Sequence, residues 1–277
     1  MITIQNLRFG YKKKPLFNEL NLRFSGGHVY GLLGKNGTGK STLLRNIAGL
    51  LFPHGGSISV NGFNPADRLP QFLADVFMVP EEFYLPDIPV EEFLSIQAPF
   101  YPGFNRQKFA GYMTIFQIPM DSTLQNMSYG QKKKVLISFA LATSAKLLLM
   151  DEPTNGLDIM SKSQFRKVLA ETLDDERCII ISTHQVKDLE NLIDRVTVID
   201  EGKILFDQDV ADITRKLSFR YAYGDEDVKG ALYSESSLKG SVVVTPNTDD
   251  EETKLDLELL YKAIVTSTAK ITKLFQS

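Results

Sequence analysis

This sequence has almost no cysteine, no tryptophan and no large excess of charge of either sign. It has one cysteine, Cys178, and no tryptophan. A single cysteine excludes a disulfide framework and a cysteine-rich zinc site. Cys178 lies in an apolar run, which predicts an inert thiol in the core. The formal net charge of -3 gives no basic footprint, so electrostatics indicate no nucleic-acid partner.

Long apolar runs are also missing. No segment approaches the roughly 20 consecutive apolar residues that span a bilayer, and the chain starts with the strand-like Ile2-Thr3-Ile4 rather than a signal peptide. We therefore expect a soluble, cytoplasmic subunit; if it drives transport, the pore belongs to another polypeptide. The 277 residues allow one sizeable core with a smaller appended unit, and no internal repeat is present.

A glycine-rich segment between an apolar run and a helical pattern is the first chemical signal. Residues 34–41 read G-K-N-G-T-G-K-S, which fits G-x-x-x-x-G-K-[ST]. Its glycines let backbone N–H groups turn toward an anion, and a helix that begins near Gly39 adds the positive end of its dipole. The alternative is a glycine-rich turn that binds nothing, but strand and helix flank the loop as phosphate binding requires.

This loop predicts a nucleoside triphosphate with Mg²⁺. Lys40 would reach the β- and γ-phosphates as a point charge, and the Ser41 hydroxyl would ligate the metal. The expected phosphate-binding set is Gly34, Asn36, Gly37, Thr38, Gly39, Lys40, Ser41 and Thr42.

An acidic pair follows a second apolar run. Residues 147–150 read L-L-L-M, as a buried parallel strand does, and Asp151 and Glu152 come directly after them. Carboxylates at the end of a central strand face the crevice where ligands bind. We expect Asp151 to hold hydrated Mg²⁺ and Glu152 to orient and deprotonate the attacking water. Alternatively, Asp-Glu-Pro merely starts a turn.

The pentapeptide at 127–131, M-S-Y-G-Q, lies between these two motifs. In this order the motifs resemble the nucleotide-binding subunit of ABC transporters, over roughly residues 1–215. The pentapeptide resembles the signature Leu-Ser-Gly-Gly-Gln, and Gly156-Leu157-Asp158 resembles the D-loop. His184, after the strand-like run 178–181, resembles the switch histidine, a catalytic residue alongside Glu152 and Lys40. Tyr11 matches the aromatic residue that stacks on adenine, although Lys12-Lys13-Lys14 beside it could simply be a solvated turn.

The resemblance implies that ATP is held between two subunits. Ser128 and the Gly130 N–H, with Gln131 in the same segment, would complete the γ-phosphate shell of a partner that is a second copy or a related ATPase. Binding would close the dimer and hydrolysis would open it. Asp158 would face the partner, and it could also cap the helix that contains Phe165 and Val168.

Two residues depart from the family pattern. Glu81, after Val79-Pro80, occupies the position of the Q-loop glutamine, and Glu82 beside it complicates the assignment. An ionised glutamate only accepts hydrogen bonds, so Mg²⁺ ligation by Glu81 could persist while any donated bond is lost. Tyr129 replaces the middle glycine of the signature, and we expect it to pack toward the partner or a membrane subunit.

The elements predict an α/β fold. We expect a P-loop NTPase core with a mainly parallel sheet and an N-terminal antiparallel β subdomain. A helical subdomain at about 84–130 would contain helices at 90–96 and 106–116, and another helix would span 132–143. Residues 216–277 would form a small α+β extension of unknown role. It would contain a strand at 242–244 and a capping box at 248–251 opening a helix through Leu255, Leu259, Leu260 and Ile264.

Two functions stay open. The first is an ATPase subunit that energises a membrane transporter by pairing with an integral membrane permease on a separate chain, at the inner face of the cell membrane. The tail is similar to those of ATPases that serve ABC-2 type exporters, which favours export. The second is a soluble ABC-type ATPase acting on a non-membrane partner, such as an iron–sulfur assembly complex.

Overall fold

The central sheet positions every other part of the molecule. We describe a computed structural model of residues 1–12, 14–223, 228–237, 240–248 and 253–276. Within these residues the sheet has six strands, in the order β5 (Val76–Val79), β6 (Leu147–Asp151), β7 (Cys178–Thr183), β3 (His28–Leu33), β8 (Arg195–Asp200) and β9 (Lys203–Asp209). The first five strands pair in parallel, and β9 pairs antiparallel with β8. The prediction of a mainly parallel sheet is confirmed.

Alternating side chains bury both faces of this sheet, as period 2 requires. In β6, Leu148 and Met150 belong to one core cluster and Leu147 and Leu149 to the other. Cys178 lies in the second cluster, fully buried, and burial raises the pKa of its thiol to about 12. The thiol is therefore protonated and shielded, which confirms the prediction of an inert core cysteine.

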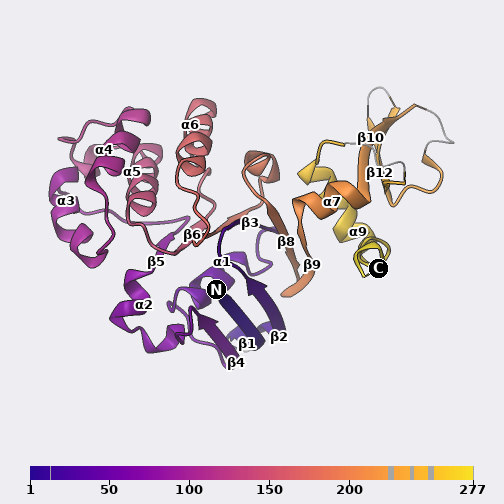
Figure 1. The fold of residues 1–277 in the computed structure, drawn as a ribbon, viewed down its shortest axis with the longest axis horizontal. Helices are drawn as coiled ribbons and strands as arrows, with labels where there is room; N and C mark the ends of the chain where they lie inside the picture. The colour runs from indigo at the N-terminus through magenta and orange to yellow at the C-terminus, as the bar shows by residue number, and fades with distance from the viewer. Residues whose placement is uncertain (13, 224–227, 238–239, 249–252, 277) are drawn as a thin grey trace.

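A three-stranded antiparallel sheet forms the N-terminal part, in the order β2 (Lys14–Phe24), β1 (Ile2–Tyr11) and β4 (Gly55–Val60). Its apolar face packs on α1 (Lys40–Ile47), which follows β3 and covers one face of the central sheet. Figure 1 shows this sheet below the central strands. The predicted N-terminal β subdomain is confirmed.

A group of helices lies on the opposite side from the N-terminal sheet (Figure 1). They are α3 (Val90–Gln97), α4 (Arg106–Ile115), α5 (Tyr129–Ala142) and α6 (Ile159–Ala170), and the short α2 (Pro70–Ala74) precedes β5. Single 3-10 turns occur at η1 (Pro65–Asp67), η2 (Ala98–Phe100), η3 (Leu124–Asn126) and η4 (Val186–Leu189). The helices expected at 90–96 and 106–116 are confirmed. The helix expected from 132 begins at Tyr129, because Ser128 caps it.

The C-terminal residues add a second layer beside the β9 edge of the central sheet. Here α7 (Val210–Lys216) leads into an antiparallel sheet in the order β10 (Leu217–Ala222), β12 (Gly240–Pro246) and β11 (Tyr233–Ser237), followed by α9 (Leu257–Phe275). Their buried residues, such as Leu217, Val244 and Leu260, join the same core cluster as the helical group. None of the helices in the described part of the chain has the length and apolar character needed to cross a bilayer.

One C-terminal expectation is wrong. The helix begins at Leu257, after its N-cap Asp256, whose side chain accepts a hydrogen bond from the Leu259 N–H at 2.9 Å. Leu255 therefore precedes the helix. Part of the expected capping box at 248–251 lies outside the described residues. The strand expected at 242–244 is confirmed within β12.

Replacing Phe139 by Ala will destabilise the fold strongly. The Phe139 side chain is 1% exposed, and its ring centroid lies 4.9 to 6.5 Å from those of five other aromatic residues. Losing these contacts costs about 3–5 kcal/mol of unfolding free energy, measurable by urea denaturation. Phe52→Ala is the control; that side chain is 53% exposed, and its loss will cost at most about 0.5 kcal/mol. Equal costs for the two variants would contradict the described core.

Candidate functional site

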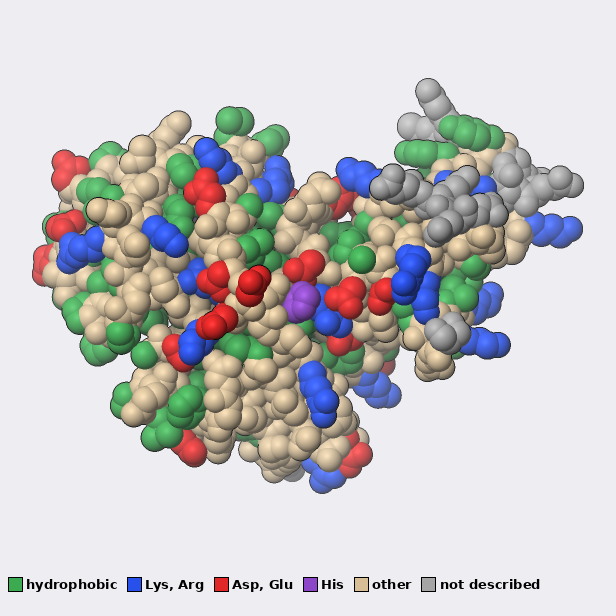
Figure 2. Space-filling model, viewed as in Figure 1, with side chains coloured by type: hydrophobic (Ala, Val, Ile, Leu, Met, Phe, Trp, Pro, Cys, Tyr) green, Lys and Arg blue, Asp and Glu red, His purple; other side chains and the backbone are tan. Residues whose placement is uncertain are grey.

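The carboxyl ends of β3, β6 and β7 meet at one level. Asp151 pairs in register with Ser182, and Leu33 pairs with Thr183. The loop 34–39 starts directly after Leu33 and ends at α1. Figure 2 shows Asp and Glu side chains gathered over the middle of the molecule, between the helices at left and the C-terminal elements at right. The sheet register therefore brings the two predicted motifs together.

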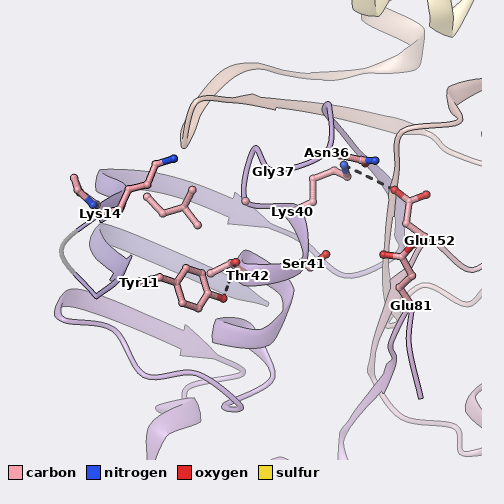
Figure 3. A pocket seen from close by; sticks show the side chains of 12 residues that line it. Tyr11, Lys14, Asn36, Gly37, Lys40, Ser41, Thr42, Glu81 and Glu152 are labelled. Carbon is pink, nitrogen blue, oxygen red and sulfur yellow. Dashed lines mark hydrogen bonds and ion pairs between the residues drawn. The ribbon is translucent and has the colours of Figure 1, made fainter. Parts of the chain in front are cut away.

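A pocket of about 410 Å³ opens above this loop (Figure 3). Glu81 and Glu152 lie on one side of it, and Tyr11 lies on the other. Its lining consists of Tyr11, Lys14, Pro15, Leu16, Asn36, Gly37, Gly39, Lys40, Ser41, Thr42, Glu81 and Glu152. Most of the sequence-predicted nucleotide residues therefore surround one cavity.

The loop has the backbone that an anion cradle needs. Gly37 has φ 84° and Gly39 has φ 111°, which side chains other than glycine rarely adopt. Gly39 is the N-cap of α1, and no acidic residue lies in the first turn, so the positive end of the helix dipole faces the pocket unopposed. Thr38 closes the loop from within, because its hydroxyl donates to the Lys35 carbonyl at 2.9 Å.

Lys40 is buried and folded back on the loop. Its Nζ donates to the carbonyl oxygens of Gly34 and Lys35, at 2.7 and 3.1 Å, and lies 3.8 Å from Glu152 Oε1. Burial lowers the pKa of Lys40, while the carboxylates of Glu152, Asp151 and Glu81 act in the opposite direction. A buried ammonium with carboxylates on one side can exchange its carbonyl partners for the phosphates of a ligand.

Asp151 is 1% exposed and is held from two sides. Its Oδ1 accepts hydrogen bonds from the hydroxyls of Ser41, at 3.0 Å, and Ser182. Its Oδ2 is buried and has no hydrogen-bond partner within the described residues. An unpartnered carboxylate oxygen beside a serine hydroxyl suits a hard cation such as Mg²⁺. No cluster of three or more His, Cys, Asp or Glu side chains in the described residues could hold a metal alone, so phosphate oxygens or water would have to complete its shell.

Glu152 is fixed by the strand end next to it. The His184 N–H donates to Oε1 at 2.9 Å, His184 Nδ1 lies 2.8 Å from the same oxygen, and the Thr183 hydroxyl donates to Oε2 at 3.0 Å. Glu152 also has φ 46°, an uncommon conformation for a residue with a side chain. The structure thus joins the predicted pair Glu152 and His184 directly.

Tyr11 lies at the far end of the pocket. Its hydroxyl and that of Thr42 are 3.1 Å apart, and its ring stands edge-on to Phe9. Lys14 and Leu16 border the same end of the cavity. The side chain is half exposed, so adenine stacking at Tyr11 stays a prediction, and so does the alternative of a solvated turn.

The signature segment lies outside this pocket. Ser128 and Gln131 form a capping box on α5: the Ser128 hydroxyl accepts from the Gln131 N–H at 3.3 Å, and Gln131 Oε1 accepts from the Ser128 N–H at 2.9 Å. Gly130 lies close to the backbone of Gly156, where a Cβ would come within 2.8 Å of the Gly156 oxygen. No residue of the segment 127–131 lines the cavity above the phosphate loop.

Asp158 caps α6, as predicted. Its side chain accepts from the Ser161 N–H at 2.8 Å, and this bond lowers the pKa of the carboxyl. The next two side chains, Ile159 and Met160, are strongly exposed. Exposed apolar residues beside the D-loop leave a surface that a second protein can cover.

Comparison with known proteins decides the family. Residues 17–155 match the family model described as ABC transporter. The chain belongs to the ABC transporter family. It is 35% identical over 216 residues to the cobalt import ATP-binding protein CbiO of Salmonella paratyphi A, covering 74% of this chain and 79% of that protein. The sequence relatives share the ATP-binding role, so the chain is an ATP-binding subunit of ABC type with ATPase activity.

Other relatives and solved structures agree. The chain is 31% identical to the lantibiotic transport ATP-binding protein SrtF of Streptococcus pyogenes, covering 76% of this chain and 91% of that protein. It is 30% identical to the SkfA peptide export ATP-binding protein SkfE of Bacillus subtilis, covering 79% and 94%. An ATP binding subunit of an ABC transporter matches with a TM-score of 0.70 at 26% identity, over 78% of this chain and 92% of that chain. The cbiO1 protein from Clostridium perfringens, part of the cbiONQ complex, matches at 0.62 and 26%, over 76% and 89%.

Several residues of the ATPase site were not predicted from the sequence. Ser182 and Thr183 hold the two acids, and their place directly before His184 was the available signal. Tyr261 on α9 had no local signal. It borders a second hollow, of about 270 Å³, together with Gly34, Lys35, Asn36, His184 and Val186. The salt bridge between Lys187 and Glu258, at 2.8 Å, also joins α9 to the segment after the histidine.

The two residues that depart from the family pattern, Glu81 and Tyr129, contact each other. The Tyr129 hydroxyl donates to the backbone carbonyl of Glu81, and the Tyr129 ring stacks on Phe83 at 5.2 Å. The Tyr129 hydroxyl and one face of its ring are engaged in its own chain, but the side chain is still 44% exposed, so packing toward a partner or membrane subunit stays a prediction. Glu81 Oε1 accepts a hydrogen bond from Asn155 Nδ2 at 3.0 Å. In this pair the donor is therefore the Asn155 amide, because the glutamate at position 81 only accepts.

Thr183→Val tests whether the Thr183 hydroxyl positions Glu152 for catalysis in addition to stabilising the fold. Thr183 and Thr197 are both fully buried, and each donates to a carboxylate, Glu152 or Asp207 respectively. Valine at 197 leaves the Asp207 acceptor unpaired, and valine at 183 leaves both the Glu152 acceptor and the Gln185 N–H donor unpaired, so each variant will lose at least about 1–3 kcal/mol of unfolding free energy. Only Thr183→Val will also slow ATP turnover by about tenfold or more, because its carboxylate lies at the pocket. Normal turnover by a folded Thr183→Val enzyme would show that this hydroxyl does not matter for catalysis.

Proposed function

We propose that this chain is the ATPase subunit of an exporter, which pairs with a second ATPase when ATP binds and separates after hydrolysis. The observation that carries the proposal is that the motif residues lie in two separate places on the chain. The phosphate loop, both acids and His184 meet at one strand edge, whereas Ser128 and Gly130 lie outside that pocket. A second chain that contributes its own Ser128 and Gly130 would complete the γ-phosphate shell.

The residue roles follow from the geometry. Gly34, Asn36, Gly37, Thr38, Gly39 and Thr42 would cradle the phosphates, and Lys40 would neutralise them. Glu152 would accept the proton of the attacking water, because its carboxylate is buried and oriented by Thr183 and His184. His184 would contact the γ-phosphate from the edge of β7, Tyr11 would stack on adenine, and Asp158 would face the second ATPase.

Magnesium fits beside the same loop. Ser41 and Asp151 Oδ2, which has no hydrogen-bond partner among the described residues, would hold it, and Glu81 would contribute from the side of the pocket where Glu152 lies. When bound, the ion neutralises charge on the phosphate oxygens. Ser182 keeps the Asp151 carboxylate oriented toward this position.

The proposal of an exporter is based on the names of the sequence relatives. Two of the three named relatives carry names for lantibiotic transport and peptide export, and the third is named for cobalt import. None of them is named for a non-membrane partner. We therefore propose an exporter complex in which this subunit lies at the cytoplasmic face of the membrane, with residues 1–215 as the ATPase domain, about 84–130 as its helical part and 216–277 as an added extension.

An apolar groove gives the membrane permease a docking place. It has a volume of about 870 Å³ and lies between α2 and residues 97–102. Leu50, Phe77 and Phe100 contribute apolar surface to it, and Arg68 lies among them. A short helix of the permease, with an apolar face and an acidic residue for Arg68, would fill this shape.

Glu152→Gln tests the ATPase cycle. The variant will bind ATP, hydrolyse it about 100-fold more slowly or worse, and accumulate as an ATP-bound dimer. Size-exclusion chromatography with light scattering reports the dimer, and phosphate release reports turnover. Lys40→Ala is the control for binding: it will neither bind ATP tightly nor dimerise. A Glu152→Gln enzyme that hydrolyses rapidly would exclude Glu152 as the base, and one that binds ATP as a monomer would exclude the two-subunit site.

Phe100→Asp tests the docking groove. A charge on this exposed ring will abolish recovery of an integral membrane protein with the tagged subunit from detergent extracts, as identified by mass spectrometry. ATP hydrolysis by the isolated subunit will not change, because Phe100 does not line the pocket at the phosphate loop. Leu173→Asp is the matched control, since Leu173 is also exposed but does not line the groove. Equal recovery with both variants would reject this docking place.

A further inference from the structure

We propose that Tyr129 and Lys133 are positioning residues that couple the nucleotide pocket of one subunit to the signature segment that serves the other pocket. The inference rests on the proposed two-ATPase complex. It concerns contacts within a single chain, between the first turns of α5 and residues 80–83. These contacts give both departures from the family pattern one shared physical role.

Tyr129 contacts two segments at once. Its hydroxyl donates to the Glu81 carbonyl, and its ring stacks on Phe83 with centroids 5.2 Å apart and planes 25° apart. The same ring lies against Gly156, where a Cβ would come within 2.7 Å of Tyr129 Cδ1. A glycine at 129 would make none of these contacts. The tyrosine therefore ties the signature to the D-loop and to the segment around Glu81.

Lys133 strengthens the same connection one turn later on α5. Its side chain is fully buried, and Nζ donates to the carbonyl oxygens of Pro80 and Glu81, both at 3.0 Å. Nζ also lies 5.2 Å from the Phe83 ring centroid. Burial lowers the pKa of Lys133 to about 8, so the ammonium is the main form at pH 7. A buried ammonium that has these two carbonyls as its hydrogen-bond acceptors resists any displacement of them.

Glu81 connects this assembly to the pocket. Its side chain lines the cavity with Lys40, Ser41 and Glu152, while Oε1 accepts from Asn155 Nδ2 at 3.0 Å. Its backbone oxygen accepts from Tyr129 and Lys133. One residue thus faces the pocket, the residue before the D-loop and the signature helix through different atoms.

A change of charge in the pocket must act on the Glu81 carboxylate, because phosphate repels it and a cation attracts it. Any shift of residue 81 is passed to Tyr129 and Lys133, since both donate to its carbonyl. Ser128, the cap of α5, directly precedes Tyr129. The loading of one pocket therefore sets the position of the serine and glycine that close the other pocket. Coupling of this kind is energetic and reciprocal, so it will appear as cooperativity between the two ATP sites.

Tyr129→Phe tests the inference, because it keeps the ring and removes the hydroxyl that donates to Glu81. Four quantities are measured: the thermal unfolding midpoint, affinity for a fluorescent ATP analogue at concentrations where the protein is monomeric, the Hill coefficient of ATP hydrolysis, and the ATP concentration that dimerises the variant in a Glu152→Gln background. Monomer affinity and the thermal unfolding midpoint will stay close to the unmodified values. The Hill coefficient will fall toward 1, and dimerisation will need about fivefold more ATP or higher.

Two further variants sharpen the test. Lys133→Met removes the other side-chain donor to the Glu81 carbonyl and, in protein that retains a cooperative thermal transition, will shift the Hill coefficient and the dimerisation threshold in the same direction. Tyr221→Phe, an exposed tyrosine on β10, is the matched control and will change none of them. An unchanged Hill coefficient and dimerisation threshold in Tyr129→Phe would overturn the inference. If Glu152→Gln alone does not dimerise with ATP, the proposed function fails as well, so the two failures are distinguishable.

Discussion

The pairing of β3 with β7 and of β7 with β6 puts a glycine loop, a serine, two carboxylates and a histidine at one edge of the sheet. Asp151 lies opposite Ser182, and Leu33 lies opposite Thr183. A slip of one residue between β6 and β7 would break the bonds from Ser182 to Asp151 and from Thr183 to Glu152, and a slip between β3 and β7 would shift the phosphate loop relative to both acids. Because both faces of these strands are buried, the register is strongly specified. The relative positions of the site residues are thus a consequence of core packing.

Buried charges at this edge of the sheet destabilise the protein without ligand and favour the binding of a ligand that can pair with them. Asp151, Glu152 and Lys40 are all buried, and one Asp151 oxygen has no partner among the described residues. Groups of this kind raise the energy of the empty site, and a triphosphate with its metal can satisfy them. Binding therefore relieves a local cost, and its energy is available for closing a second subunit over the phosphates. In the proposed two-subunit complex, the signature segment, which is fixed as a helix cap outside the pocket, would serve as that cover.

The sequence predicted the parts of the site that are local. The phosphate loop, Asp151, Glu152 and His184 each follow an apolar strand, so motif and context agree, and the N-cap role of Asp158 needed only its place before a helix. Contacts between distant segments were not predictable, because no spacing rule links Tyr129 to Glu81 or Tyr261 to the phosphate loop. The start of α9 was misplaced because residues 248–251 have the spacing of a capping box, whereas Asp256 provides the cap that is observed. The bond from the Tyr129 hydroxyl to the Glu81 carbonyl was not predicted, while packing of the exposed part of the side chain toward a partner or membrane subunit stays a prediction.

The central claim is that ATP is held between the phosphate loop of one chain and the signature of another. Cysteines placed beside each surface, Lys35→Cys and Asn126→Cys in one Glu152→Gln chain, would test this with a short thiol-reactive cross-linker. Both positions are exposed, and the native Cys178 is buried and protonated, so it will not react. The account predicts a covalent dimer that forms rapidly with ATP and Mg²⁺ and only weakly without nucleotide. Cross-linking that is absent, or equally fast without ATP, would contradict it.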